Sequence, residues 1–333
     1  MPTMPATSEI RRLRGDDLDR MVVIDRAHSG RSRRPFLGKR LAIGAIAPAE
    51  HLQFGVELDG RLAGLLLGRV QRGEFGRIDS SVVIDVIGVA AESRGRGCGR
   101  ALLEAVSAEA RSLGLPRLHS QAEWTMFGLL RFFAGTGFEL SHRLVLERPV
   151  DRPFIEIGDE KRADEPTEVD YGRPPGPDYG PLARDRIPTR TMSNADLAAM
   201  AAIDREITGR DRSAYLAAKF AATLAGSDVG VSLVAELDGR VVGFVTARVG
   251  VGEFGRTEPA AELDTLGVSP ECRSRGVGRA LLSQLSANLA SLRVERIATE
   301  VDWSDRDVLG FFGRYGFAPS RTLAFERELA GRR

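Results

Sequence analysis

The chain has 333 residues, of which 43% are hydrophobic, and this length and composition suit a soluble protein of two domains. Its 47 basic and 46 acidic residues nearly cancel, which excludes a nucleic-acid partner held by a basic surface. No apolar run is long enough for a membrane span, and residues 1–15 lack the apolar core of a signal peptide, so we expect a cytoplasmic protein with no membrane partner.

The first part of the chain predicts an α/β domain with a mixed central β-sheet flanked by helices. Asp59-Gly60 between two apolar segments is typical of a two-residue hairpin turn. Residues 81–89 are almost continuously apolar, as expected of a central strand that is covered on both faces. In chain order we expect a strand at 9–13, helices at 16–28 and 34–46, strands at 54–58, 61–70 and 81–89, a helix at 101–113, a strand at 118–123, a helix at 127–134 and one or two strands within 138–147.

The same plan recurs after residue 187, because the chain contains an internal repeat. Gly73-Glu74-Phe75-Gly76-Arg77 returns as Gly252-Glu253-Phe254-Gly255-Arg256, and other motifs return at the same shift of 179 residues. Residues 151–187 are rich in Pro, Gly and charged side chains, a composition that predicts a linker. We therefore predict a first domain at 1–150, a linker at 151–187 and a second domain at 188–333, which together form a pseudo-dimer within one chain.

A glycine-rich loop follows the apolar central strand in each copy, as residues 94–99 and 273–278. Backbone amides at the start of the next helix, with the flanking arginines, favour a phosphate site over a plain helix-capping turn. A Walker loop would need Gly-Lys-Ser/Thr where Arg100-Ala101 stands, and the dinucleotide pattern G-x-G-x-x-G is absent. Cys98 and Cys272 are the only cysteines and lie in different halves, so we expect neither a zinc site nor a disulfide.

These strand and loop residues resemble the cofactor motif of the GNAT superfamily of acyltransferases. Phe132-Phe133 followed by Gly137-Phe138 is similar to the closing helix and strand of that family, and the second copy repeats both features. The resemblance implies acetyl-coenzyme A, or another acyl-coenzyme A, with its pyrophosphate on the loop and its pantetheine arm along the central strand. A primary amine of a small molecule or a protein would attack the thioester directly, with a strand amide stabilising the oxyanion. The residues thus implied in cofactor binding are Ile87, Gly88, Val89, Arg94, Gly95, Arg96, Gly97, Cys98 and Gly99, and Leu266, Gly267, Val268, Arg273, Ser274, Arg275, Gly276, Val277 and Gly278.

The two copies differ in the carboxylates that can take a proton from the amine. The second copy has Glu262 and Asp264 on its central strand and Glu300 on the next strand, where the resemblance places a general base. The first copy has Val83 for Glu262 and Gln121 for Glu300, and keeps only Asp85 for Asp264 and, on the next strand, Glu123 for Asp302. Asp85 and Asp264 interrupt apolar strands in both copies, so a structural role stands beside the catalytic one. We expect the second copy to be the catalyst and the first to bind coenzyme A.

Other positions depart from the family pattern. The tyrosine that usually protonates the leaving thiolate is replaced by Phe133 and Phe312. The missing tyrosines favour a rival hypothesis, an acyl-coenzyme A sensor in which one or both copies lack catalysis. We also expect Trp124 and Trp303 to pack in the core rather than near the acceptor cleft, and Cys98 to be a filler of the loop rather than a nucleophile.

Overall fold

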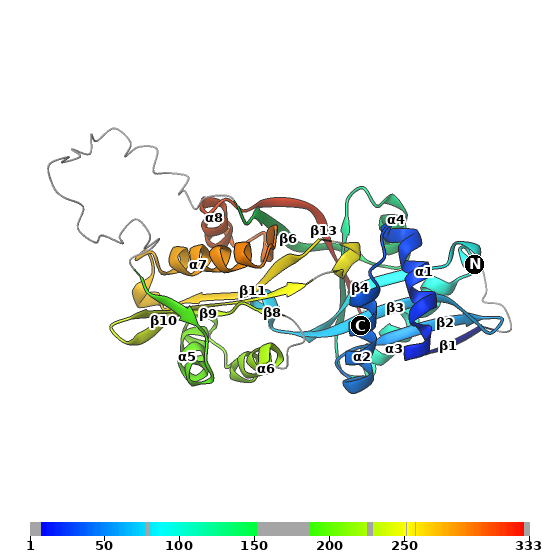
Figure 1. The fold of residues 1–333 in the computed structure, drawn as a ribbon, viewed down its shortest axis with the longest axis horizontal. Helices are drawn as coiled ribbons and strands as arrows, with labels where there is room; N and C mark the ends of the chain where they lie inside the picture. The colour runs from blue at the N-terminus through cyan, green and yellow to red at the C-terminus, as the bar shows by residue number, and fades with distance from the viewer. Residues whose placement is uncertain are drawn as a thin grey trace. The chain divides into compact units, whose positions relative to one another are not determined.

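The computed structural model describes residues 8–77, 80–151, 187–224, 229–250, 252–256 and 258–329. Its helices and strands follow the predicted order in the first repeat, with α3 beginning three residues earlier than expected and a single closing strand, one of the two predicted possibilities (Figure 1). The elements are β1 (Ser8–Arg12), η1 (Gly15–Asp17), α1 (Leu18–Ser29), α2 (Arg34–Ile46), β2 (Gln53–Leu58), β3 (Arg61–Arg72), η2 (Glu74–Gly76), β4 (Ser80–Val89), η3 (Ala91–Ser93), α3 (Cys98–Ser112), β5 (Arg117–Glu123), α4 (Phe127–Gly135) and β6 (Glu139–Pro149).

The second repeat has the same plan, with a short extra strand, β8. Its elements are β7 (Thr189–Thr191), η5 (Asn194–Asp196), α5 (Leu197–Thr208), α6 (Ser213–Leu224), β8 (Val229–Gly230), β9 (Leu233–Leu237), β10 (Arg240–Gly250), η6 (Glu253–Gly255), β11 (Ala260–Val268), η7 (Pro270–Cys272), α7 (Val277–Ser291), β12 (Arg296–Asp302), α8 (Arg306–Arg314) and β13 (Ala318–Glu328). The predicted linker lies outside the described residues, except for its first and last positions.

Left-handed backbone positions repeat with the sequence motifs. The hairpin turns have φ of 54° at Asp59 and 73° at Gly60, and 52° at Asp238 and 73° at Gly239, as a two-residue hairpin turn requires. Phe75 and Phe254 also share a positive φ, of 57° and 51°. The duplication therefore extends to the backbone conformation of individual residues.

The compact units of the structure do not coincide with the repeats. The first unit consists of the described residues in Met1–Leu144, Val251–Pro259 and Arg321–Arg333, and the second of those in Val145–Gly250 and Ala260–Ser320. Within the first unit the strand order is β1-β2-β3-β4-β5-β13, so the last strand of the second repeat completes the sheet of the first. Within the second unit the order is β6-β12-β11-β10-β9-β7, with β6 represented by its end from Val145 onward. The domain boundaries predicted from the sequence did not anticipate these exchanges.

The sheet of the first unit is covered on both faces, because β3 points apolar side chains in both directions. Leu65 and Leu67 pack with Met21 of α1 and Leu37 of α2. Figure 1 shows these two helices over the strands of the first unit. Leu66 packs instead in the larger cluster that holds the buried face of α3. This two-sided core fixes the position of β4, the strand that carries the first copy of the cofactor motif.

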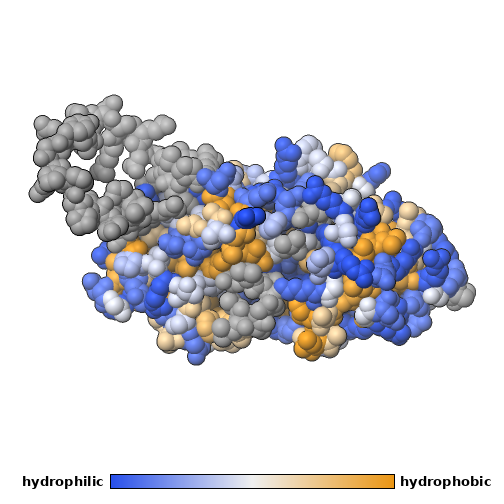
Figure 2. Space-filling view, viewed as in Figure 1, coloured by the Kyte–Doolittle hydropathy of each residue, from blue (hydrophilic) through white to orange (hydrophobic). Residues whose placement is uncertain are grey.

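The described residues contain no helix that is both long enough and apolar enough to cross a membrane. In the face shown in Figure 2, hydrophilic side chains surround smaller apolar patches. Within the same described ranges, no group of three or more His, Cys, Asp or Glu side chains is arranged to hold a metal ion.

Candidate functional site

The central strand of each unit separates from its parallel neighbour halfway along its length. β4 pairs with β5 over Val82–Ile84, and the pairing stops there. Asp85 is the extra residue of a β-bulge, since Leu67 pairs with Val86 and Gly68 pairs with Ile84. The backbone groups of β4 beyond the bulge therefore face a gap in the sheet, where a ligand can form the next row of hydrogen bonds.

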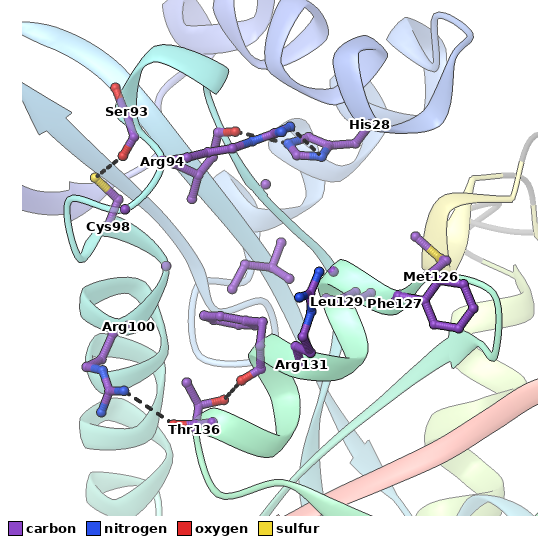
Figure 3. Close-up of a pocket in the computed structure, with 18 of the residues that line it drawn as sticks. His28, Ser93, Arg94, Cys98, Arg100, Met126, Phe127, Leu129, Arg131 and Thr136 are labelled. Atoms are coloured by element: carbon purple, nitrogen blue, oxygen red, sulfur yellow. Dashed lines mark hydrogen bonds between the residues drawn. The ribbon is translucent and has the colours of Figure 1, made fainter.

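A cavity of about 910 Å³ occupies this gap in the first unit (Figure 3). It brings together most of the predicted cofactor residues of the first copy, namely Ile87, Gly88, Val89, Arg94, Gly95, Gly97, Cys98 and Gly99. Arg100 also lines it and donates to the carbonyl of Gly135 at 3.3 Å. Arg96 does not line the cavity, and its guanidinium lies 4.0 Å from the carboxylate of Asp59 instead.

The loop leaves its backbone amides available to an anion. Gly95 and Gly97 have φ of 76° and 83°, a conformation that costs glycine little. Gly97 is the N-cap of α3 and no side chain caps that helix, so its first amides are not satisfied by a capping group. Cys98 is buried, and burial raises the pKa of its thiol, which agrees with a filler and not a nucleophile.

Several residues of the cavity carried no sequence signal. His28, at the end of α1, is the clearest: its Nε2 lies 3.0 Å from the carbonyl oxygen of Val89, and Arg94 approaches its Nδ1 at 3.4 Å (Figure 3). Met126, Phe127 and Leu129, around the start of α4, form an apolar part of the wall. The repeat does not mark this position either, because Ile207 stands at the position of His28 in the second copy.

The second unit repeats the separated strands and the loop. β11 pairs with β12 over Ala260–Glu262, so Leu266, Gly267 and Val268 lie beyond the paired segment. Gly276 has φ of 85° and is the N-cap of α7, again without a capping side chain. Ser274, which stands in the place of Gly95, has φ of 59°. The loop is completed, as the shift of 179 residues predicts, by Arg273, Arg275, Val277 and Gly278. A Cβ built on Gly276 would lie 3.9 Å from Cδ1 of Ile187, so the last residue of the predicted linker lies against this loop.

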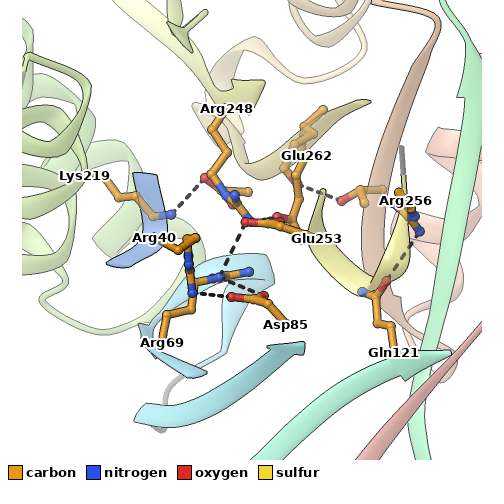
Figure 4. A network of polar contacts seen from close by, with 12 residues as sticks. Arg40, Arg69, Asp85, Gln121, Lys219, Arg248, Glu253, Arg256 and Glu262 are labelled. Carbon is orange, nitrogen blue, oxygen red and sulfur yellow. Dashed lines mark hydrogen bonds and ion pairs between the residues drawn. The ribbon is translucent and has the colours of Figure 1, made fainter. Parts of the chain in front are cut away.

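Asp85 is held by two arginines in the first unit. Its buried carboxylate accepts from Nη2 of Arg40 at 2.6 Å and from Nε of Arg69 at 3.2 Å (Figure 4). The side chain of Asp85 has no exposed surface. Since both cations are already paired with it, this carboxylate is suited to holding α2 and β3 against β4.

The equivalent residues of the second unit are paired differently. Nζ of Lys219, which replaces Arg40, lies 2.9 Å from Oδ2 of Asp264. Arg248, which replaces Arg69, donates to Glu262 at close range (Figure 4). Oδ1 of Asp264 is buried and has no hydrogen-bond partner among the described residues. Glu300 is half-buried on β12, two residues beyond Ala298, the last paired position of that strand.

The aromatic positions divide into core and surface. Phe133 and Phe312, which replace the usual tyrosine, are buried in the core. Tyr315 is also buried, with its ring centroid 5.0 Å from that of Phe311. The expectation that Trp124 and Trp303 pack in the core was wrong: they are 51% and 60% exposed, because each stands at the turn after the strand that precedes the closing helix.

Comparison with known proteins gives one family. A model of the acetyltransferase (GNAT) family matches residues 23–138 and 197–317. A tandem GNAT protein from the clavulanic acid biosynthesis pathway, solved without acetyl-coenzyme A, is 18% identical with a TM-score of 0.62, and the match covers 98% of this chain and 100% of that one. A GCN5-related N-acetyltransferase from Sphaerobacter thermophilus is 16% identical with a TM-score of 0.58, covering 98% and 97%. At these identities the two structures are similar to this chain in fold.

Proposed function

Because the chain belongs to the acetyltransferase (GNAT) family, we propose that it transfers an acetyl group from acetyl-coenzyme A to a primary amine of a small molecule or a protein. The observation that carries the proposal is the cavity of about 910 Å³ between a separated strand and an uncapped glycine loop. Its lining joins the arginines and glycines of the loop to the edge of β4 and the apolar start of α4, which suits a cofactor with a charged end and an extended arm. Bound there, acetyl-coenzyme A would supply an activated thioester.

The residues present fit that cofactor in each unit. The loop amides around Gly97 and Gly276, with Arg94 and Arg273, would hold the pyrophosphate. The free edges at Ile87–Val89 and Leu266–Val268 would accept the pantetheine arm as an added row of hydrogen bonds. An amide of that edge would also face the oxygen of the thioester carbonyl and stabilise negative charge on it. The remaining loop positions of the two copies would shape the same cradle.

The acceptor amine needs a base, because a lysine-like amine with a pKa near 10.4 is almost fully protonated at neutral pH. We assign this role in the second unit to the group of Glu262, Asp264 and Glu300, which lie at or just beyond the point where β11 and β12 separate. Asp264 is supported by its buried Oδ1, an acceptor atom without a partner among the described residues. Glu262 is paired with Arg248 and would have to exchange that partner for the amine.

Release of coenzyme A thiol from acetyl-coenzyme A, measured over a panel of primary amines, tests the proposal. D264N and E300Q should each lower kcat/KM by about 10²-fold or more if that side chain takes the proton. E206Q, which alters an exposed carboxylate on α5, should change nothing. Absence of amine-dependent thiol release from the unaltered protein, over a broad panel, would contradict the proposal.

A second candidate function is sensing of acyl-coenzyme A without chemistry. It is supported in the first unit by Val83 and Gln121 at the two base positions and by the pairing of Asp85 with two arginines. Binding of acetyl-coenzyme A without turnover in either unit would favour it.

A further inference from the structure

On the central strand of the first unit, Val83 stands where the second unit has Glu262. A carboxylate from the second repeat nevertheless lies close to this position. In the β3–β4 register, Arg69 lies directly opposite Val83. In the β10–β11 register, Arg248 lies directly opposite Glu262 and is ion-paired with it. The first unit thus keeps the arginine of this pair and lacks the glutamate at the matching strand position.

Glu253 supplies a carboxylate at that arginine. It belongs to η6, which is part of the first unit although it lies in the second repeat. Its Oε1 is 3.9 Å from Nε of Arg69, and its side chain is 15% exposed (Figure 4). η6 packs on β4 and β5, the two strands that separate to form the cavity. Glu253 is therefore within ion-pair distance of Arg69, the arginine that corresponds to Arg248 of the second unit, although Glu262 contacts Arg248 more closely.

The segment that carries Glu253 is fixed in the first unit by several independent contacts. Arg33, itself in a buried ion pair with Asp25, donates at close range to the carbonyl of Gly252. A Cβ on Gly252 would lie 2.5 Å from Cγ of Phe36, and the φ of Gly252 is 100°. Only glycine therefore fits at this position. On the other side of η6, Nη2 of Arg256 lies 3.3 Å from Oγ1 of Thr322. A base held on a rigid segment keeps its geometry during the reaction.

We propose that Glu253 is the general base of the first unit, and that each acyl transfer there uses a cofactor cradle from one repeat and a carboxylate from the other. This proposal rests on the acetyltransferase function proposed above. Glu253 takes one proton from the ammonium form of a primary amine. The amine nitrogen then bonds to the acyl carbon, and the carbon–sulfur bond breaks with its electron pair left on sulfur. The nitrogen loses its second proton through water to the thiolate, and Glu253 returns the first proton to solvent. The products are the amide, free coenzyme A and one released proton.

The test isolates the first unit with G276E, which places a bulky anion in the cofactor loop of the second. In this background E253Q should lower kcat/KM by about 10²-fold or more, leave the affinity for coenzyme A unchanged in calorimetry, and remove the acidic limb of the pH–rate profile. V83E should restore turnover to E253Q, because it puts a carboxylate opposite Arg69 as Glu262 is opposite Arg248. E258Q is the matched control, since Glu258 lies on the same segment, 41% exposed, and pairs with Arg31 at 3.5 Å.

The outcomes separate the two proposals. Full turnover of G276E/E253Q overturns the role of Glu253 and leaves the acetyltransferase intact. An inactive G276E protein beside an active unaltered protein shows that the first unit does no chemistry, which also overturns it. E253Q could instead lose turnover that V83E does not restore, together with a lower coenzyme A affinity or a lower urea midpoint of unfolding. That result assigns Glu253 a structural role and overturns its role as base. Inactivity of the unaltered protein overturns the proposed function itself.

Discussion

Replacing Arg40 by methionine should destabilise the first unit, because it removes one of the two cations that hold buried Asp85. The side chain of Asp85 has no exposed surface, and the contact from Arg40 is the shorter of the two, at 2.6 Å against 3.2 Å from Arg69. A hydrogen bond to a charged group contributes about 1.5–3 kcal/mol, and a buried charge that loses a partner costs about 3–5 kcal/mol when none remains. Since Arg69 remains, we expect R40M to lower the free energy of unfolding by about 2–3 kcal/mol.

Urea unfolding followed by the fluorescence of Trp124, in a W303F background, reports on this unit. Trp124 follows β5, and both tryptophans are more than half exposed, so W303F should cost little. Adding D85N to R40M removes a buried charge that has lost one of its two cations and should recover part of the loss. An unfolding free energy of R40M within about 0.5 kcal/mol of the parent would refute the structural role of Asp85.

Two further predictions concern the second unit. G278A should lower the unfolding free energy of this unit by about 1–3 kcal/mol, because the new Cβ would lie 2.8 Å from Cε2 of Phe311. The control G310A, on α8 with open space around it, should be neutral or slightly stabilising. A G278A protein as stable as the unaltered protein would contradict this packing. Hydrogen bonding from Arg190 holds the pKa of Asp196 well below its ordinary value, so this pair stabilises the fold above pH ~4 and its contribution falls as the pH drops below that. D196N should therefore lower the free energy of urea unfolding by on the order of 1 kcal/mol at pH 7, a figure that already allows for solvent screening of half-exposed Arg190. The loss should be smaller at pH 3. An equal loss of unfolding free energy at both pH values would contradict the assignment.

Most of the fold could be predicted from the sequence because its signals are local. The periodicity of 34–46 predicted α2 with its observed ends, and Asp59-Gly60 predicted the conformation of the hairpin turn. The fixed shift of 179 residues then carried each assignment from one copy to the other. The GNAT membership, expected from the strand and the glycine loop, was confirmed by the match to both copies.

The exchange of segments could not be predicted in this way. A β13 paired with β5 has the same alternating apolar pattern as one paired within its own repeat. The position of η6 depends on contacts between residues more than 200 positions apart in the sequence, such as the hydrogen bond from Arg33 to Gly252. Periodicity and motif spacing carry no information at that distance.

The candidate site was predictable where a backbone motif defines it and not where side chains from separate elements meet. His28 reaches Val89 from a helix end that has no motif. The pairing partners of Asp85 come from α2 and β3, so the sequence left open whether this residue is structural. The exposed tryptophans were misplaced because large aromatic side chains favour the core on average, whereas the turn after β5 and after β12 leaves them at the surface.

Calorimetric titration with coenzyme A tests most directly whether both glycine loops are cofactor sites. We predict binding at two sites in the unaltered protein, with one site lost in G97E and the other in G276E, because a glutamate at either helix N-cap places a negative charge where the pyrophosphate would lie. Binding of unchanged stoichiometry and affinity in both variants would contradict the account.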